Sequence, residues 1–303
     1  MTRFGVWCVS AAVTGAIMVL ASAGAVPTSA SPAGVPADRL AVAVAPTCGG
    51  ERPLKAGGGR YACSFEENFT GSRLDPTKWV VTETATSGLH ASLTGCYVNR
   101  PQNVLVANGT LNLASRLERF ACKQPFGIYS AKSTAGAVTS TKRFAQTYGR
   151  FEFRARFPSA TVAGAHSALW LYPQENTYGS WPHSGEVDVA EWFSARPTKV
   201  YPSVHYGGEN KKGTGHDCTV PTASTAYHRY AVEWTPTSMR FLYDGKVCHI
   251  HSWIAASPLS GSRPFDKPFY LVMNQVVGQL WNAVSASTPA VSTLQVDWVR
   301  VWR

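Results

Sequence analysis

The sequence is poor in charged residues and lacks the local patterns that mark several common protein classes. Charged residues make up 15% of its 303 residues, against about a quarter in average soluble proteins. Lys and Arg exceed Asp and Glu by 28 to 18, but the basic residues are scattered and form no block or nucleic-acid motif. We therefore expect no nucleic-acid partner, and we interpret the charge as that of a basic exported protein.

Four further patterns are missing. No C-x-x-C pair occurs, which argues against a zinc site. No stretch has the periodicity of a long amphipathic helix, so helical folds are disfavoured. No internal repeat is visible either. No long apolar stretch follows the one near the N-terminus, and beyond that stretch we expect no contact with a membrane.

The N-terminus has the features of an export signal. Arg3 precedes an uncharged apolar run from about Val6 to Val26, which predicts a signal peptide over residues 1–30 and a secreted protein. The run is long enough that an uncleaved membrane anchor is the alternative. Residues 31–47 are rich in Ala, Pro and Val and predict a flexible linker. The catalytic domain is expected over residues 48–303.

Removal of the signal would leave six cysteines. An even number in an exported chain indicates disulfides. Six cysteines allow fifteen pairings, and local closure favours pairs of neighbours. The predicted disulfides are Cys48–Cys63, Cys96–Cys122 and Cys218–Cys248.

Short alternating runs separated by turn residues predict the fold class. Asn108-Gly109 separates two such runs and is a strong hairpin signal. In the run 151–157, the residues Phe151, Phe153, Ala155 and Phe157 share one face, and charged residues such as Glu152, Arg154 and Arg156 share the other. The sequence therefore predicts an all-β sandwich of two antiparallel sheets.

Three acidic residues within six positions suggest an active site. Retaining glycosidases need two carboxyl groups about 5–5.5 Å apart, and residues i and i+2 of a strand point to one side. Glu186 and Asp188 therefore share a face, while Val187 and Val189 face the core.

Glu191 breaks this alternation, because a regular strand would direct it into the core. A β-bulge near Ala190 would return it to the side of Glu186 and Asp188. Neighbouring acids repel one another, so their pKa values separate and one can stay protonated, as an acid catalyst must. An exposed acidic strand or a calcium site is the alternative explanation of the three acids alone.

The segment from Trp181 to Glu191, WPHSGEVDVAE, resembles the signature of glycoside hydrolase family 16. Its form W-P-x-x-G-E-[IV]-D-[IV]-x-E is typical of laminarinases, agarases and carrageenases. Further segments are similar to family strands in the same order along the chain: Phe65–Trp79, Tyr148–Glu152, Ser203–Tyr206, Pro268–Asn274 and Val296–Val301.

The resemblance implies a jelly-roll, concanavalin-like β-sandwich whose concave face carries a polysaccharide cleft. By motif position, Glu186 would be the nucleophile, Asp188 would orient it, and Glu191 would be the acid/base. Water or a second sugar would then attack the glycosyl-enzyme, giving hydrolysis or transglycosylation.

The resemblance also implies sugar contacts at Trp181, His205, Trp281, Asn99 and Asn274. For Trp181 a core position is the alternative, for His205 an ordinary sheet histidine, and for Asn99 a loop cap.

Two further points concern the outer face and the substrate. Many relatives carry a structural calcium ion on the convex face, where Asp297 and Glu67 match, although a strand-end aspartate without metal explains Asp297 equally well. We expect no other cofactor. Ala137 stands where relatives often have an arginine, which leaves the substrate open.

These features predict a secreted, monomeric, retaining endo-β-glycanase with β-1,3-glucan as the leading substrate. A galactan or agar hydrolase of the same fold is the alternative within the enzyme class. A non-catalytic carbohydrate-binding protein is the alternative outside it, and the intact acids argue against that class.

Overall fold

The computed structural model describes residues 45–92, 94–209 and 216–303. The expected signal peptide (1–30) and most of the expected linker (31–47) lie outside these residues. Within the described ranges, no helix is long and apolar enough to cross a membrane.

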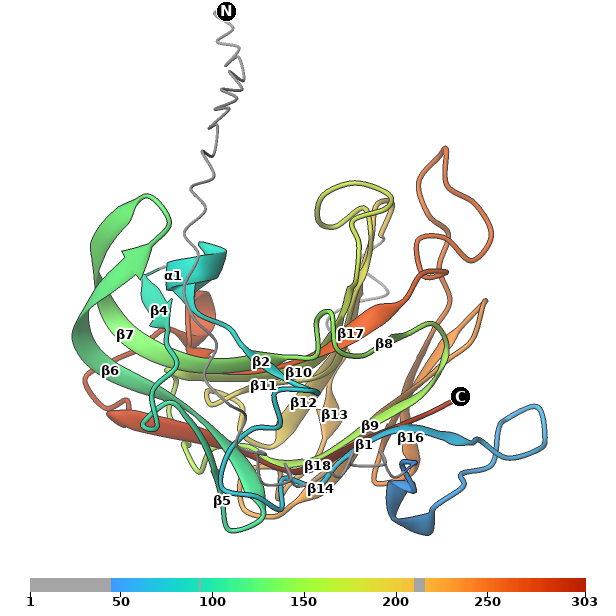
Figure 1. Cartoon of the computed structure of the whole chain (residues 1–303), viewed down its shortest axis with the longest axis horizontal. Helices are drawn as coiled ribbons and strands as arrows, with labels where there is room; N and C mark the ends of the chain where they lie inside the picture. Colours follow the sequence, from blue (N-terminus) through green and yellow to red (C-terminus); the bar gives the residue numbers. More distant parts are fainter. Residues whose placement is uncertain (1–44, 93, 210–215) are drawn as a thin grey trace, which may run out of the picture. The chain divides into compact units, whose positions relative to one another are not determined.

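The described domain consists of two stacked β-sheets (Figure 1). The upper sheet of Figure 1 contains β2 (Val80–Val81), β8 (Ala145–Gln146), β10 (Ala165–Pro173), β11 (Glu186–Phe193), β12 (Lys199–His205), β13 (Cys218–Thr219) and β17 (Phe269–Val277). The lower sheet contains β1 (Cys63–Glu67), β5 (Val104–Ala107), β6 (Thr110–Gln124), β9 (Gly149–Arg156), β14 (His228–Trp234), β15 (Met239–Tyr243), β16 (Lys246–His251) and β18 (Val291–Trp302). The short strands β3 (His90–Ala91) and β4 (Gly95–Tyr97) pair with each other, and β4 pairs with the first part of β7 (Gly127–Thr139). This is the predicted all-β sandwich.

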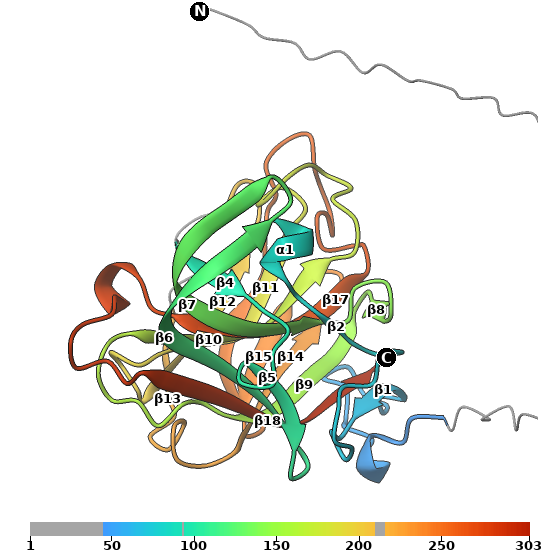
Figure 2. The ribbon, with the colours of Figure 1, turned by 60° about the vertical axis from the view of Figure 1, so that its left-hand side comes forward.

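Strand β7 (Gly127–Thr139) joins the two sheets. Its first part pairs with β6, and its last residues pair with β17 and β2 of the upper sheet. The long β6–β7 hairpin rises above the upper sheet beside the short helix α1 (Thr84–Ser87) (Figures 1 and 2). It therefore borders one end of the face that carries the acidic residues. The only other helical segments described are single 3-10 turns, η1 (Cys48–Gly50) and η2 (Leu280–Asn282).

Local sequence patterns explain the strands and their pairing. Asn108 and Gly109 have positive φ values of 54° and 72°, as a type I′ hairpin requires, and they connect β5 to β6. Phe151, Phe153 and Ala155 on β9 are fully buried between the sheets, as the alternation predicted.

The three predicted disulfides are present. Cys48–Cys63 closes the N-terminal segment, Cys96–Cys122 links β4 to β6, and Cys218–Cys248 links β13 to β16. The last of these connects a short strand of the upper sheet to the lower sheet. Such cross-links stabilise a fold mainly by restricting the unfolded chain.

Strand β11 contains the predicted bulge. Asp188 pairs with Ser203 of β12 and Glu191 pairs with Tyr201, so two residues of β11 stand opposite one of β12. Val189 and Ala190, the two residues between these pairs, are both fully buried, as is Val187. The bulge therefore places Glu191 on the same side as the other two acids, as the parity argument required.

Candidate active site

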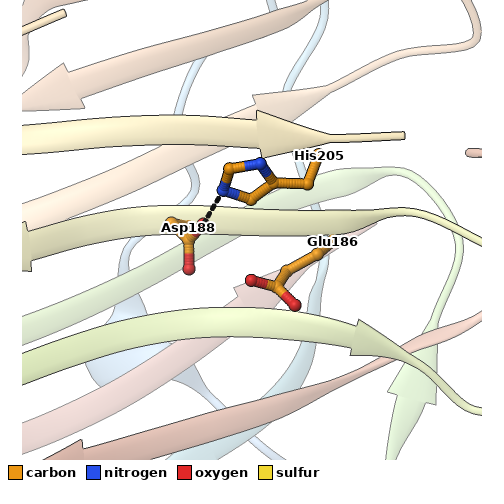
Figure 3. A group of neighbouring side chains, drawn as sticks. All are labelled: Glu186, Asp188 and His205. Carbon is orange, nitrogen blue, oxygen red and sulfur yellow. Dashed lines mark ion pairs between the residues drawn. The ribbon is translucent and has the colours of Figure 1, made fainter. Parts of the chain in front are cut away.

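The three acidic side chains of β11 point to the open side of the upper sheet. Asp188 is 4% exposed, and the carboxylate oxygens of Glu186 and Asp188 and a ring nitrogen of His205 lie within 4.8 Å of one another. Figure 3 shows these three side chains converging from β11 and the neighbouring β12. His205 stands opposite Glu186 in the strand register, so the sheet itself brings them together.

Asp188 interacts with His205. The Nε2 atom of His205 is 3.4 Å from Oδ2 of Asp188, the contact drawn as a dashed line in Figure 3. On its other side, Nδ1 of His205 lies 3.1 Å from Oε2 of Glu209. The imidazole thus lies between two carboxylates.

Glu191 has its own partners, which come from the strands on either side of β11. His166 Nε2 on β10 is 3.1 Å from Glu191 Oε1, and the hydroxyl of Ser203 on β12 donates to Oε2 at 3.2 Å. The His166 ring stacks on Phe193 with centroids 4.3 Å apart. Neither contact with Glu191 was predicted from the sequence. Alternation along a single strand assigns each residue to one of its two faces. Only the order of the strands in the sheet shows that His166 and Ser203 lie on the same face as Glu191.

Burial and mutual repulsion dominate the electrostatics of the cluster. Burial, followed by the charge of Asp188, raises the pKa of Glu186, while His205 opposes this rise. Burial, followed by the charge of Glu191, raises the pKa of Asp188. A raised pKa on Glu186 runs against a nucleophile, which must be ionised. Because the carboxyls interact strongly, a proton bound by the pair belongs to both, and Glu186 is ionised when Asp188 holds it.

His205 supplies the compensating positive charge. Burial alone would lower its pKa, but the hydrogen bond to Asp188 and the charges of Asp188, Glu186 and Glu209 raise it to about 10. At neutral pH the cluster therefore combines an imidazolium with several carboxyl groups, which favours ionised acids in a buried site.

Two exposed tryptophans lie close to the acids. Trp181 is 55% exposed, and its ring centroid is 6.0 Å from that of His205, so the alternative of a core tryptophan is wrong. Trp281 is also 55% exposed and packs on Phe193, with Arg196 over its ring at 5.4 Å.

Glu191 lines a hollow of about 370 Å³. The other lining residues come from β11, β12 and the segments beyond them: Phe193, Arg196, Tyr201, Ser203 and Trp281. Aromatic faces beside a carboxyl group are suited to hold the apolar face of a sugar ring next to an acid catalyst.

The two predicted asparagines lie in different places. Asn274 on β17 is 6% exposed and accepts a hydrogen bond from Trp170 Nε1 at 2.7 Å. It belongs to the register row that runs from Ala137 through Asn274 and Ala168 to Glu191, so the position without the arginine is in the row of Glu191. Asn99 is exposed and lines a separate hollow with residues such as Trp79. Its sugar contact stays a prediction.

The two residues matched to a calcium site have other partners. Asp297 forms an ion pair with Arg154. Glu67 accepts hydrogen bonds from the Phe69 amide at 2.8 Å and from Trp79 Nε1 at 3.2 Å. Arg154 is paired with Oδ2 of Asp297 and an N–H group donates to each oxygen of Glu67, so both side chains have protein partners, and a calcium ion there stays a prediction.

Comparisons with known proteins agree with the geometry. Residues 97–300 match the model of glycosyl hydrolases family 16. The chain is 33% identical to a beta-glucanase of Rhodothermus marinus, with 84% of this chain and 89% of that protein covered. It is also 33% identical to glucan endo-1,3-beta-glucosidase A1 of Niallia circulans, with 79% of this chain and 37% of that protein covered.

A solved structure has the same fold. The laminarinase of Rhodothermus marinus is 33% identical and superposes with a TM-score of 0.69, over 80% of this chain and 97% of its own. The jelly-roll sandwich, the bulged acidic strand and the match over residues 97–300 lead to one conclusion: the chain belongs to glycosyl hydrolase family 16.

Proposed function

We propose that this glycoside hydrolase is an endo-acting β-1,3-glucanase that cleaves with retention of configuration. The observation that carries the proposal is the bulge in β11, which sets Glu186, Asp188 and Glu191 on one face of the sheet. Two carboxyl groups flanking one bond are the requirement of the double-displacement mechanism.

In the proposed first step, the Glu186 carboxylate attacks the anomeric carbon while the Glu191 carboxylic acid protonates the leaving oxygen. The glycosidic bond breaks, and a glycosyl ester of Glu186 forms. In the second step, Glu191, now ionised, takes a proton from water as that water attacks the anomeric carbon and releases Glu186. Asp188 holds Glu186 in place and shares a proton with it.

Glu191 protonates the leaving group, so the sugar on that side would occupy the hollow beside Glu191. Trp281 offers that sugar an aromatic face, because more than half of its surface is exposed. Trp181 would stack on the sugar bound next to Glu186, since the Trp181 side chain hydrogen-bonds Glu186 and its ring lies beside that of His205.

The substrate proposal is supported by relatives named for activity on β-1,3-glucan. A galactan hydrolase is the second candidate, because the chain is also 28% identical to a keratan-sulfate endo-1,4-beta-galactosidase of Sphingobacterium multivorum over 80% of its length. Ala137 stands in the row of Glu191 where relatives often have an arginine, so the choice between a glucan and a galactan substrate has to be made by experiment.

We also propose that the protein is exported and acts outside the cytoplasm. Its three disulfides support an oxidising compartment. The basic, uncharged and apolar order of residues 1–30 supports an export signal.

Product analysis on a polysaccharide panel tests the substrate. The panel contains laminarin, lichenan, agarose and arabinogalactan, and Glu186→Gln serves as the control for contaminating activity. We expect short oligosaccharides from laminarin with the wild type and none with the variant. Products from agarose or arabinogalactan alone would favour the galactan hydrolase, and no turnover of any polymer would favour a binding protein.

A further inference from the structure

Glu209 lies on a tight turn directly after β12, four residues beyond His205. Its backbone N–H donates to the Tyr206 carbonyl at 3.1 Å. Gly208 has φ +91°, and a side chain there would come within 2.6 Å of the Ala256 backbone nitrogen. The Ala256 N–H donates to the Gly207 carbonyl at 2.8 Å. The turn is therefore fixed by its glycines and by the neighbouring chain, and this fixes where Glu209 starts.

The Glu209 carboxylate determines which nitrogen of His205 carries a proton. A carboxylate can only accept, so the contact of 3.1 Å requires a proton on Nδ1. A neutral His205 would then direct its Nε2 lone pair at Asp188. Two acceptors would face each other across 3.4 Å unless Asp188 were protonated. The His205–Asp188 contact consequently holds one proton in either charge state.

We propose that Glu209 is a positioning residue of the active site: it holds a proton on Nδ1 of His205, so that the second proton, on Nε2 facing ionised Asp188, makes the ring an imidazolium beside Asp188 and Glu186. This proposal rests on the proposed function, because Glu209 would affect catalysis through the nucleophile Glu186. The positive charge on His205 favours the ionised form of Glu186, and ionised Glu186 is the form that attacks the sugar.

Several other ionisable groups face this network. They are Glu186, Asp188 and Glu191 on β11, His166 and Tyr172 on β10, Tyr206 directly after β12, Tyr270 on β17, His183 in the loop before β11, and His251 on β16. Burial lowers the pKa of His251, so this histidine does not replace the charge of His205. The charges of Asp188, Glu186 and Glu209 favour a protonated His205, and Glu209 is the carboxylate that contacts Nδ1.

Glu209→Gln separates charge from shape. The glutamine amide can donate to Nδ1, which permits a neutral His205 that still donates from Nε2 to Asp188. With the positive charge lost, Glu186 ionises at higher pH. We expect the acid limb of the kcat/KM profile on laminarin to move upward by about one pH unit. Glu175→Gln is the matched control, since Glu175 is an exposed residue of the loop after β10, and its profile should coincide with that of the wild type.

Two more measurements separate positioning from folding. Thermal unfolding shows whether the variant is folded, and ¹⁵N shifts of the His205 ring should be those of an imidazolium at pH 7 in the wild type and of a neutral ring in Glu209→Gln. Glu209→Asp, which retains the charge, should keep the acid limb near its wild-type position. A Glu209→Gln profile that coincides with the wild type, or is lowered equally at all pH values, would overturn the proposal. Failure of the proposed function is distinct, because the wild type itself would then not turn over laminarin.

Discussion

Replacing Glu186 by glutamine should abolish turnover and stabilise the folded protein at neutral and alkaline pH. The carboxylate oxygens of Glu186 and Asp188 lie within 4.8 Å of each other, and two unit charges at that limit repel by about 3.5 kcal/mol at an effective dielectric constant of about 20. His205 lies within the same distance of Glu186 and attracts its carboxylate by a similar amount. What remains is the cost of removing a carboxylate from water, on the order of 2 kcal/mol after partial compensation. For a domain of this size we expect the midpoint of thermal unfolding to rise by about 4–8 °C.

The sign of the pH dependence follows from the raised pKa of Glu186. Below its ordinary pKa the carboxyl is protonated in the folded and unfolded states, and its contribution to stability is fully present. Between the ordinary pKa and the raised value, the unfolded chain ionises this carboxyl while the folded protein keeps it protonated, so stability is lost across this interval and the loss levels off above the raised value. The gain in Glu186→Gln should therefore be absent near pH 4 and complete near pH 8. The reasoning is refuted if calorimetry shows no gain at pH 8, or the same gain at both pH values.

Two more predictions concern the other half of the mechanism. Glu191→Ala should lose most activity on laminarin. Azide should restore turnover of a substrate with an activated aryl leaving group, because that leaving group needs no acid and azide replaces the water that Glu191 activates. The absence of a glycosyl azide product would contradict the acid/base role. Trp281→Ala should lower kcat/KM on laminarin by about 10- to 100-fold, the value of one lost aromatic contact of about 1.4–2.8 kcal/mol. It should leave the rate on an aryl glycoside nearly unchanged, since that substrate places no sugar beside Glu191; equal losses on both would place Trp281 elsewhere in the cleft.

The site was predictable from the sequence where it depends on one strand. Period-two alternation fixed the face of Glu186 and Asp188, and the wrong parity of Glu191 required the bulge that β11 contains. His166 and Ser203 were not predictable, because they reach Glu191 across neighbouring strands. Local patterns define where a strand lies in the sequence, but pairing between strands is decided by how the whole sandwich packs.

The outer face of the lower sheet also contains contacts that could not be predicted from the sequence. Alternation predicted that Glu152 would point away from the core, and it does, yet it is only 1% exposed. Arg150 covers it, with an Nη2–Oε2 distance of 2.7 Å, and also reaches Glu233 of β14 at 2.8 Å. These partners lie on strands that are adjacent in space. The sequence contains the charges, but only the register shows that they form a buried network.

The bulge is held by the core and not by the acids that depend on it. Val187, Val189 and Ala190 are fully buried, and the pairing of β11 is shifted against both β10 and β12 at this point. A straight β11 would have to slip against two strands at once and would turn its buried residues outward. Neutralising an acid should therefore change the charge of the site without moving the strand. For this reason, differences in pH profile and stability among the glutamine variants report electrostatics, and Glu191 keeps its place facing the cleft in each of them.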